Sequence, residues 1–367
     1  MSAVVDEVLP YPFLAIVGQA ELKMALVLAL INPQIGGVLL IGPYGVGKTT
    51  AVRGLLDVMP TVEVEETDEA GNPVKRRRPM RLIELPLNAR MEDVVGGINE
   101  RVALEQQRVL LEEGVLARAH RNVLYIDEVN LLDARVVDAI LDAAAQGRTF
   151  VRRGPVTRLY PSQFVLIGSM NPQEGTLRPQ ILDRFGLRVW VAPLMDPDQR
   201  LEIYRRARRF REDPETFRAG YADETAKLKQ EIAAAREILP QVTIDGEAER
   251  FAIDCIQRLA IPSHRAEIAL FEAARARAAA DFRLSATIED IRRVALLALR
   301  QRRSVQIDEY AATVALEDNA IDQVINGNGD AMRRRRSSRK KSPSTRASGV
   351  TPPTPADGTH QDHSSER

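Results

Sequence analysis

The 367-residue chain has little sulfur and little histidine, with one cysteine, Cys255, and four histidines. A single cysteine cannot form an internal disulfide, so we expect a disulfide-free fold in a reducing compartment, the cytoplasm. The apolar neighbours Phe251 to Ile256 predict that this thiol is buried and packs as a small hydrophobe. No group of His, Cys and acidic residues has the spacing of a transition-metal site, which argues against a protein-bound transition metal.

Long apolar runs and a net charge are absent as well. The segment Met1 to Glu7 lacks the regions of a secretory signal, and no stretch approaches the ~18 apolar residues of a membrane span. The formal net charge is zero, so the whole chain gives no electrostatic argument for a nucleic-acid or membrane partner. Residues 331–367 nevertheless hold nine basic and three acidic residues. This basic tail reads either as a solvated, unstructured segment or as a contact for an acidic partner.

Apolar runs alternate with helical patterns in the first half of the chain. Patterns such as Glu21–Leu30 and Ala134–Ala145 have the periodicity of helices. The apolar runs suit strands that are buried on both faces of a parallel sheet: Gly37–Gly42, Arg81–Leu85, Asn122–Asp127, Phe164–Gly168 and Arg188–Val191. We therefore predict an α/β domain over residues 1–195, with a parallel sheet flanked by helices. The charged segment Glu65–Arg78 reads as an exposed excursion, and Arg148–Pro161 reads as a hairpin.

The pattern changes after about Asp196, where strand-like runs stop. Five helical segments follow: Pro197–Ala207, Asp223–Leu239, Gly246–Leu259, His264–Phe282 and Ile288–Arg302. The spacing of Thr287 and Asp290 is that of a helix cap with an acidic residue in the first turn. We predict an all-helical domain over residues 196–327, followed by a disordered basic tail over 328–367.

The strongest motif is Gly42-Pro-Tyr-Gly-Val-Gly-Lys-Thr49, which follows an apolar run and matches the phosphate-binding P-loop. Its glycines let backbone N–H groups surround a phosphate, and the next helix adds its positive end. Lys48 is expected to reach the β- and γ-phosphates, and Thr49 to offer its hydroxyl to Mg²⁺. ATP and Mg²⁺ are thus the expected cofactors, with these nucleotide contacts: Gly42, Pro43, Tyr44, Gly45, Val46, Gly47, Lys48, Thr49 and Thr50.

Polar side chains follow two further apolar runs. Val123-Leu-Tyr-Ile-Asp-Glu128 ends in two carboxylates, at the sheet edge that faces ligands in open α/β folds. Asp127 is expected to hold Mg²⁺ and Glu128 to polarise the attacking water; without a P-loop, the pair would read as a helix-capping turn. Asn171 could orient that water, although an Asn before a proline is also an ordinary turn former.

Two arginines complete the candidate catalytic set. Arg184, in Leu182-Asp-Arg-Phe185, reads as an arginine finger against developing γ-phosphate charge, or as part of a surface ion pair. It would lie on the wrong side of its own domain, so this role implies a ring of identical subunits. Arg265, at the start of a predicted helix, could reach back to the γ-phosphate and report the nucleotide state to the helical domain.

Several longer strings resemble the ATPase subunit I of magnesium chelatase, an AAA+ family, over roughly Tyr11 to Arg303. They are Tyr11-Pro-Phe-Leu-Ala-Ile-Val-Gly-Gln19, Ile35-Gly-Gly-Val-Leu39, Gly114-Val-Leu-Ala-Arg-Ala-His120, Tyr125-Ile-Asp-Glu-Val-Asn-Leu-Leu132, Gly168-Ser-Met-Asn-Pro-Gln-Glu-Gly175 and Leu177-Arg-Pro-Gln-Ile-Leu-Asp-Arg-Phe185. The resemblance implies an ATPase ring, expected to be a hexamer. It also implies two partners, an AAA+ D-type subunit with a von Willebrand-type domain and a porphyrin-binding H-type subunit. Together they insert Mg²⁺ into protoporphyrin IX for (bacterio)chlorophyll synthesis.

The resemblance also implies local features. Residues Ile16 to Gln19, which include Val17 and Gly18, would line the adenine pocket. Hairpins would lie at Met91–Leu111 and at Arg148–Pro161. The chain departs from the family in having Pro43 and Tyr44 where an Asp-Arg pair is usual, and Thr49 where Ser is usual. It also lacks the cysteine that many members carry within Thr61–Pro79, which excludes thiol regulation there.

Two other functions remain open at this point. One is a MoxR-like AAA+ ATPase that remodels or activates a von Willebrand-domain partner without a porphyrin. The other is a DNA-dependent motor, suggested only by the basic tail, for which the body of the chain offers no further support.

Overall fold

The computed structural model describes residues 9–67, 73–98, 105, 111–153, 156–303 and 313–321. Residues up to Ser304 form one unit, and a helix at residues 313–321 belongs to a second unit that starts at Val305. The predicted tail over 328–367 lies outside the described residues. In the ranges described, none of the helices is long and apolar enough to cross a membrane.

A five-stranded parallel sheet forms the centre of the first unit, in the order β11-β1-β10-β7-β4. Its strands coincide with the five predicted runs: β1 (Val38–Ile41), β4 (Leu82–Leu85), β7 (Val123–Ile126), β10 (Val165–Met170) and β11 (Leu187–Trp190). In β1, Val38 and Leu40 pack into the core on one face, while Leu39 and Ile41 pack into the core on the other. Burial on both faces explains why these strands read as continuous apolar runs, and the α/β prediction is confirmed.

Helices cover both faces of this sheet: α1 (Ala20–Ile31), α2 (Lys48–Gly54), α3 (Met91–Val95), α5 (Val115–Arg118), α6 (Ala134–Gln146) and α7 (Pro179–Arg184). Short 3-10 turns join them: η1 (Phe13–Ala15), η2 (Pro33–Ile35), η3 (Leu55–Asp57), η4 (Val129–Leu131) and η5 (Pro172–Glu174). The ends of α6 show how the sequence sets such boundaries. The carboxylate of Asp133 accepts the N–H of Arg135 at the start, and Gly147 ends the helix with φ +67°.

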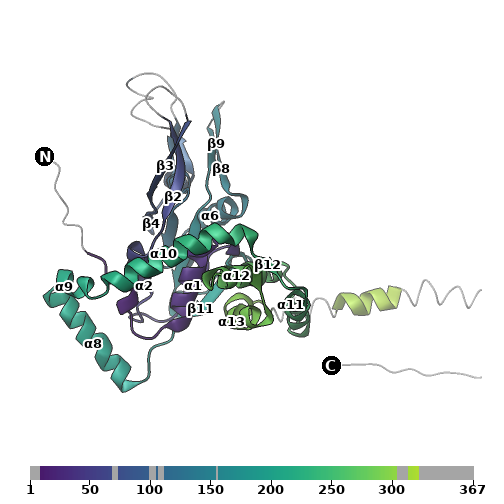
Figure 1. The fold of residues 1–367 in the computed structure, drawn as a ribbon. Coiled ribbons are helices and arrows are strands. Elements are labelled where there is room, and N and C mark those ends of the chain that lie inside the picture. Colours follow the sequence, from purple (N-terminus) through teal and green to yellow (C-terminus); the bar gives the residue numbers. More distant parts are fainter. Residues whose placement is uncertain are drawn as a thin grey trace, which may run out of the picture. The chain divides into compact units, whose positions relative to one another are not determined.

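Three antiparallel hairpins interrupt the α/β pattern: β2 (Thr61–Thr67) with β3 (Pro73–Pro79), β5 (Gly96–Ile98) with β6 (Leu111–Glu113), and β8 (Arg148–Arg153) with β9 (Val156–Pro161). Figure 1 shows β2–β3 and β8–β9 projecting from the sheet. The predicted hairpin at Arg148–Pro161 is confirmed. The charged segment Glu65–Arg78, predicted to be an exposed excursion, forms much of the β2–β3 hairpin, and Lys75 to Arg77 are exposed there. Val62 and Val64, which precede this segment in β2, are buried.

The later part of the first unit is mainly helical: α8 (Pro197–Glu212), α9 (Pro214–Ala219), α10 (Ala222–Ile238), η6 (Leu239–Gln241), α11 (Gly246–Arg258), α12 (Arg265–Ala280) and α13 (Ile288–Leu299). Two short strands, β12 (Thr243–Ile244) and β13 (Ser285–Ala286), pair in parallel, so strands do not stop entirely after residue 196. The capping pair Thr287 and Asp290 is confirmed at the start of α13. That helix ends at Leu299, three residues before its predicted end, and Cys255 is half-buried rather than buried.

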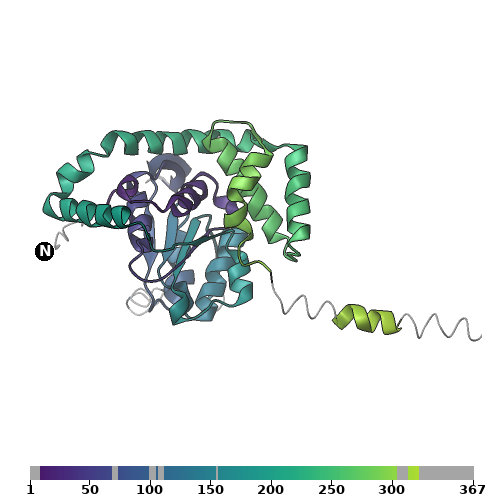
Figure 2. The same cartoon turned by 90° about the horizontal axis from the view of Figure 1, so that it is seen from below.

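The helical part packs directly against the sheet domain. In Figure 2 the long helix α10 passes α1 and reaches α12. Apolar residues of α12, such as Leu270 and Ala273, share one core with α1 and β1. At the end of α1, the Asn32 amide donates to Glu272 Oε2 of α12 at 2.7 Å. The two parts are therefore joined on the face that α1 covers.

Candidate functional site

The P-loop connects β1 to α2 in the expected place. Gly45 and Gly47 have φ of +74° and +89°, a left-handed conformation that glycine adopts without strain, and a Cβ at either would meet nothing within 4 Å. Inside the loop, Lys48 Nζ donates to Gly42 O at 2.6 Å and to Pro43 O at 2.8 Å. Burial lowers the pKa of Lys48, and the nearby Asp127 and Glu128 oppose that shift. The open, donor-rich cradle fits a polyphosphate.

Asp127 lies beside the P-loop because β7, β10 and β1 are neighbours in the sheet. Three hydroxyls donate to its carboxylate: Thr49 at 3.1 Å, Tyr125 at 2.8 Å, and Ser169 through a short bond. Carboxylate and hydroxyl oxygens are the ligands that Mg²⁺ prefers, so Asp127 and Thr49 could hold that ion. The hydroxyls fix the orientation of the carboxylate before any ligand binds.

Glu128 and Asn171 reach the same cavity of about 310 Å³, which Lys48 and Thr49 also line. Glu128 has φ +53°, and its backbone N–H donates to Ser169 Oγ at 3.1 Å. Asn171 is fully buried, and its Oδ1 accepts the N–H of Gln173 at 3.1 Å. Its Nδ2 has no hydrogen-bond partner among the described residues, which leaves one buried donor for a ligand in the cavity.

A second cavity of about 550 Å³ adjoins the P-loop, with Tyr44, Val46 and Thr50 in its wall. Val17 lines it as predicted, whereas Gly18 is not among its lining residues. A Cβ on Gly18 would lie 3.0 Å from the Leu194 side chain, so this glycine allows the segment to pack closely behind the cavity wall. The mainly apolar lining of this second cavity suits a purine base.

Sequence reasoning missed part of this second cavity and part of the Asp127 cluster. Apart from Tyr11, the lining residues it missed follow β11 or lie on α8, where no motif marks them: Pro193, Leu194, Arg200, Ile203 and Ala207. Ser169 and Tyr125 were missed as supports of Asp127. The period of two along a strand could have placed Ser169 on the face of Asn171, and Tyr125 on the face of Asp127.

The two predicted arginines lie elsewhere. Arg184, at the end of α7, pairs with Asp142 of α6 at 2.5 Å, and Arg265 Nη1 lies 3.7 Å from Asp183 Oδ2. Both line a separate cavity of about 250 Å³, and neither lines the two cavities at the P-loop in the part of the chain described. The expectation that Arg265 reaches the γ-phosphate of its own subunit is not met in this arrangement. Helix α12 packs against α1 and carries Arg265 to the side of Arg184.

Comparison with known proteins agrees with this architecture. Residues 13–183 match the family model "Magnesium chelatase, subunit ChlI", and residues 251–323 match an AAA lid domain. A relative in Methanocaldococcus jannaschii, named magnesium-chelatase subunit ChlI homolog, is 41% identical over 310 residues, which cover 80% of this chain and 85% of the relative. The chain belongs to the magnesium chelatase subunit I family.

Another member of the subunit I family, the magnesium-chelatase 38 kDa subunit of Chlorobaculum tepidum, is 39% identical over 316 residues, 80% of this chain and 81% of its own. A solved protein from Cytophaga hutchinsonii shares the fold, with a TM-score of 0.52 at 21% identity, over 79% of this chain and 84% of that one. The matched family region contains the P-loop, Asp127, Glu128 and Asn171. Every residue that lines the phosphate cavity therefore lies within the part of the chain that the family model matches.

Proposed function

We propose that this chain is the ATP-hydrolysing AAA+ motor subunit of a magnesium chelatase. It drives insertion of Mg²⁺ into protoporphyrin IX together with a D-type subunit and a porphyrin-binding H-type subunit. The observation that carries this proposal is the gathering of Lys48, Asp127, Glu128 and Asn171 around one cavity in a chain of the subunit I family. We infer the substrate, protoporphyrin IX, from family membership, and we infer ATP hydrolysis from the residues of the cavity.

The polar residues that carry this proposal have distinct roles in ATP hydrolysis. Lys48 and the P-loop N–H groups bind the phosphates, while Thr49 and Asp127 hold the Mg²⁺ that accompanies ATP and offsets its charge. Glu128 accepts the proton of the attacking water, and the unpaired Nδ2 of Asn171 orients that water toward the phosphate. Val17 and Leu194 contact the base in the adjoining cavity.

The site is completed by a second copy of the chain. Arg184 and Arg265 line the same cavity, away from the subunit's own P-loop, and their side chains are 27% and 48% exposed. In a ring, expected to be a hexamer, both arginines of one subunit face the nucleotide of the next. Arg184 then releases Asp142 and neutralises charge that develops on the transferred phosphate. This arrangement supports an arginine finger that acts between subunits.

Reconstitution tests the proposed function. The purified chain is combined with D-type and H-type subunits, Mg-ATP and protoporphyrin IX, and Mg-protoporphyrin is followed by its fluorescence. We expect metal insertion that requires all three proteins and ATP hydrolysis, and that is abolished when Lys48→Ala replaces the wild-type chain. ATPase activity without any metal insertion above background would contradict the chelatase assignment and would favour another von Willebrand-domain partner.

A further inference from the structure

We propose that Arg302 and Arg188 are positioning residues, which set Arg184 for the nucleotide of the neighbouring subunit and couple it to the helical part of the chain. The inference rests on the proposed function, because it assumes that Arg184 acts between subunits. Neither arginine touches the nucleotide cavities, and both are almost fully buried, with side-chain exposures of 0% and 1%.

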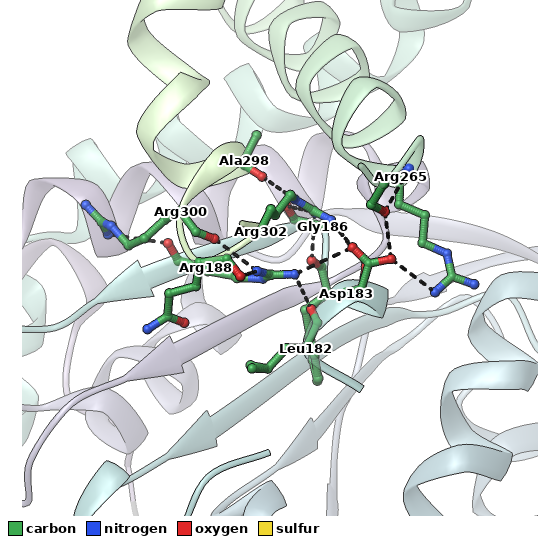
Figure 3. A network of polar contacts seen from close by, with 11 residues as sticks. Leu182, Asp183, Gly186, Arg188, Arg265, Ala298, Arg300 and Arg302 are labelled. Carbon is green, nitrogen blue, oxygen red and sulfur yellow. Dashed lines mark hydrogen bonds and ion pairs between the residues drawn. The ribbon is translucent and has the colours of Figure 1, made fainter. Parts of the chain in front are cut away.

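The two guanidinium groups contact the backbone between Leu182 and Gly186 (Figure 3), the segment that contains Arg184. Arg188 Nη2 donates to Leu182 O at 2.6 Å. Arg302 Nη1 donates to Asp183 O at 3.3 Å, and its Nη2 donates to Phe185 O at 3.1 Å and to Gly186 O at 3.0 Å. Two carbonyls before Arg184 and two after it are therefore fixed by side chains from other elements. This backbone sets where the Arg184 guanidinium points.

The same guanidinium groups anchor the end of the helical part. Arg302 Nε donates to Ala298 O in α13 at 2.6 Å. Arg188 Nη1, from β11, donates to Arg300 O at 3.0 Å and to Gln301 O at 2.6 Å. Helix α13 ends at Leu299, and Gln301 has φ +57°, so the chain turns here and brings the Arg302 side chain under α7. A movement of α13 is thereby transmitted to the segment that carries Arg184.

Asp183 joins Arg265 to this network. Its Oδ1 accepts from Arg302 Nη1 at 2.8 Å, while its Oδ2 accepts from Ser263 Oγ at 2.7 Å and lies 3.7 Å from Arg265. One carboxylate thus contacts the segment before α12 and the segment after α13 at the same time. The two arginines that face the neighbour, Arg184 and Arg265, are held as one unit.

Electrostatics argue that the network serves more than stability. Burial, together with repulsion from Arg302, lowers the pKa of Arg188 to about 9, and burial also lowers the pKa of Arg302. Two buried cations share the carboxylate of Asp183, whose side chain is 28% exposed, and the cost of removing both cations from water offsets much of what these ion pairs contribute to stability. The planar fork of arginine can span several carbonyls at fixed angles, which a lysine cannot do. Replacement by lysine therefore keeps the positive charge but removes the simultaneous hydrogen bonds to several carbonyls.

The test uses Arg302→Lys, with Arg293→Lys on the exposed face of α13 as the matched control. Binding of a fluorescent ATP analogue and the melting temperature are measured first, to show that the variant is folded and that its own P-loop site is intact. Because a displacement of about 1 Å can cost on the order of 100-fold in rate, we expect Arg302→Lys to lose at least about tenfold in kcat with unchanged nucleotide affinity. Arg293→Lys should keep wild-type kcat.

Mixed rings separate positioning of the finger from damage to the variant's own site. Lys48→Ala subunits cannot use ATP but present an intact Arg184. Mixed with Arg302→Lys subunits, they should restore ATPase activity, as they should with Arg184→Ala subunits. Rescue of Arg184→Ala without rescue of Arg302→Lys would overturn the positioning role alone. Failure to rescue Arg184→Ala in proven mixed rings would instead overturn the shared site of the proposed function. If Arg302→Lys does not fold, Arg188→Lys is carried through the same mixtures with the same two outcomes.

Discussion

Substitution of Ser169 by Ala probes the least expected support of the catalytic cavity. Ser169 is fully buried, donates to the Asp127 carboxylate and accepts the backbone N–H of Glu128 at 3.1 Å. The variant removes one of three hydroxyl donors to Asp127 and leaves the N–H of Glu128 without its acceptor. Because Glu128 has φ +53°, a conformation that is unfavourable for a non-glycine residue, loss of this tether frees it to move.

The expected loss in kcat follows from the lost hydrogen bond between the Glu128 N–H and Ser169 Oγ. A buried N–H left without a partner costs about 1–3 kcal/mol, which corresponds to about 5- to 150-fold in kcat if it is expressed in the transition state. Tyr125→Phe is the matched control, since its hydroxyl donates to Asp127 at 2.8 Å and has no bond to Glu128. We expect its kcat to stay within about 3-fold of wild type, a change below about 0.7 kcal/mol.

The assay is steady-state ATP hydrolysis at saturating ATP, with Mg²⁺ varied. Both variants should need more Mg²⁺ for half-maximal rate, because each removes one of the hydroxyls that donate to the Asp127 carboxylate. Only Ser169→Ala should lower kcat at saturating Mg²⁺. Equal kcat values in the two variants would refute the reasoning that Ser169 holds Glu128 in place, and so would a Ser169→Ala enzyme with wild-type kcat.

Two further predictions concern the chemistry and the packing. Glu128→Gln should bind a fluorescent ATP analogue normally and lose about 10²- to 10⁴-fold in kcat, because the amide cannot accept a proton; near-normal turnover would contradict the role of Glu128. Gly186→Ala should destabilise the protein by about 3 kcal/mol, since its Cβ would lie 1.7 Å from Ile35 O, whereas Gly220→Ala has 3.4 Å to its nearest neighbour and should be tolerated in thermal melts. Equal melting temperatures for the two glycine variants would exclude the predicted clash.

The sequence predicted the sheet and the phosphate cavity well because both depend on local signals. Each strand is an apolar run buried on two faces, and the P-loop has a fixed spacing that places Lys48 and Thr49 at the start of a helix. Asp127 and Glu128 follow β7, which only β10 separates from the P-loop strand β1, so the order of the parallel sheet brings them to the P-loop. Their roles in catalysis remain predictions that the variants above test.

Features that depend on packing between distant segments could not be predicted in this way. Arg265 was expected near its own nucleotide, but the shared core of α1 and α12 carries it to Asp183 instead. Apart from Ala298 O, one helical turn earlier, the partners of Arg302 lie more than a hundred residues earlier in the chain, so nothing local marks this side chain as buried. The strand pairing of β2 with β3 was not predicted, because the alternation of Val62 and Val64 with acidic residues was its only strand signal.

The central claim is that the catalytic site is shared between two copies of the chain. It is tested most directly by ATPase measurements on mixtures of Arg184→Ala and Lys48→Ala subunits, each inactive alone, with ring formation verified by light scattering. Mixed rings place an intact Arg184 beside an intact P-loop at some interfaces, so the account predicts activity that rises and falls with the mixing ratio. Verified mixed rings that stay inactive at every ratio would contradict it.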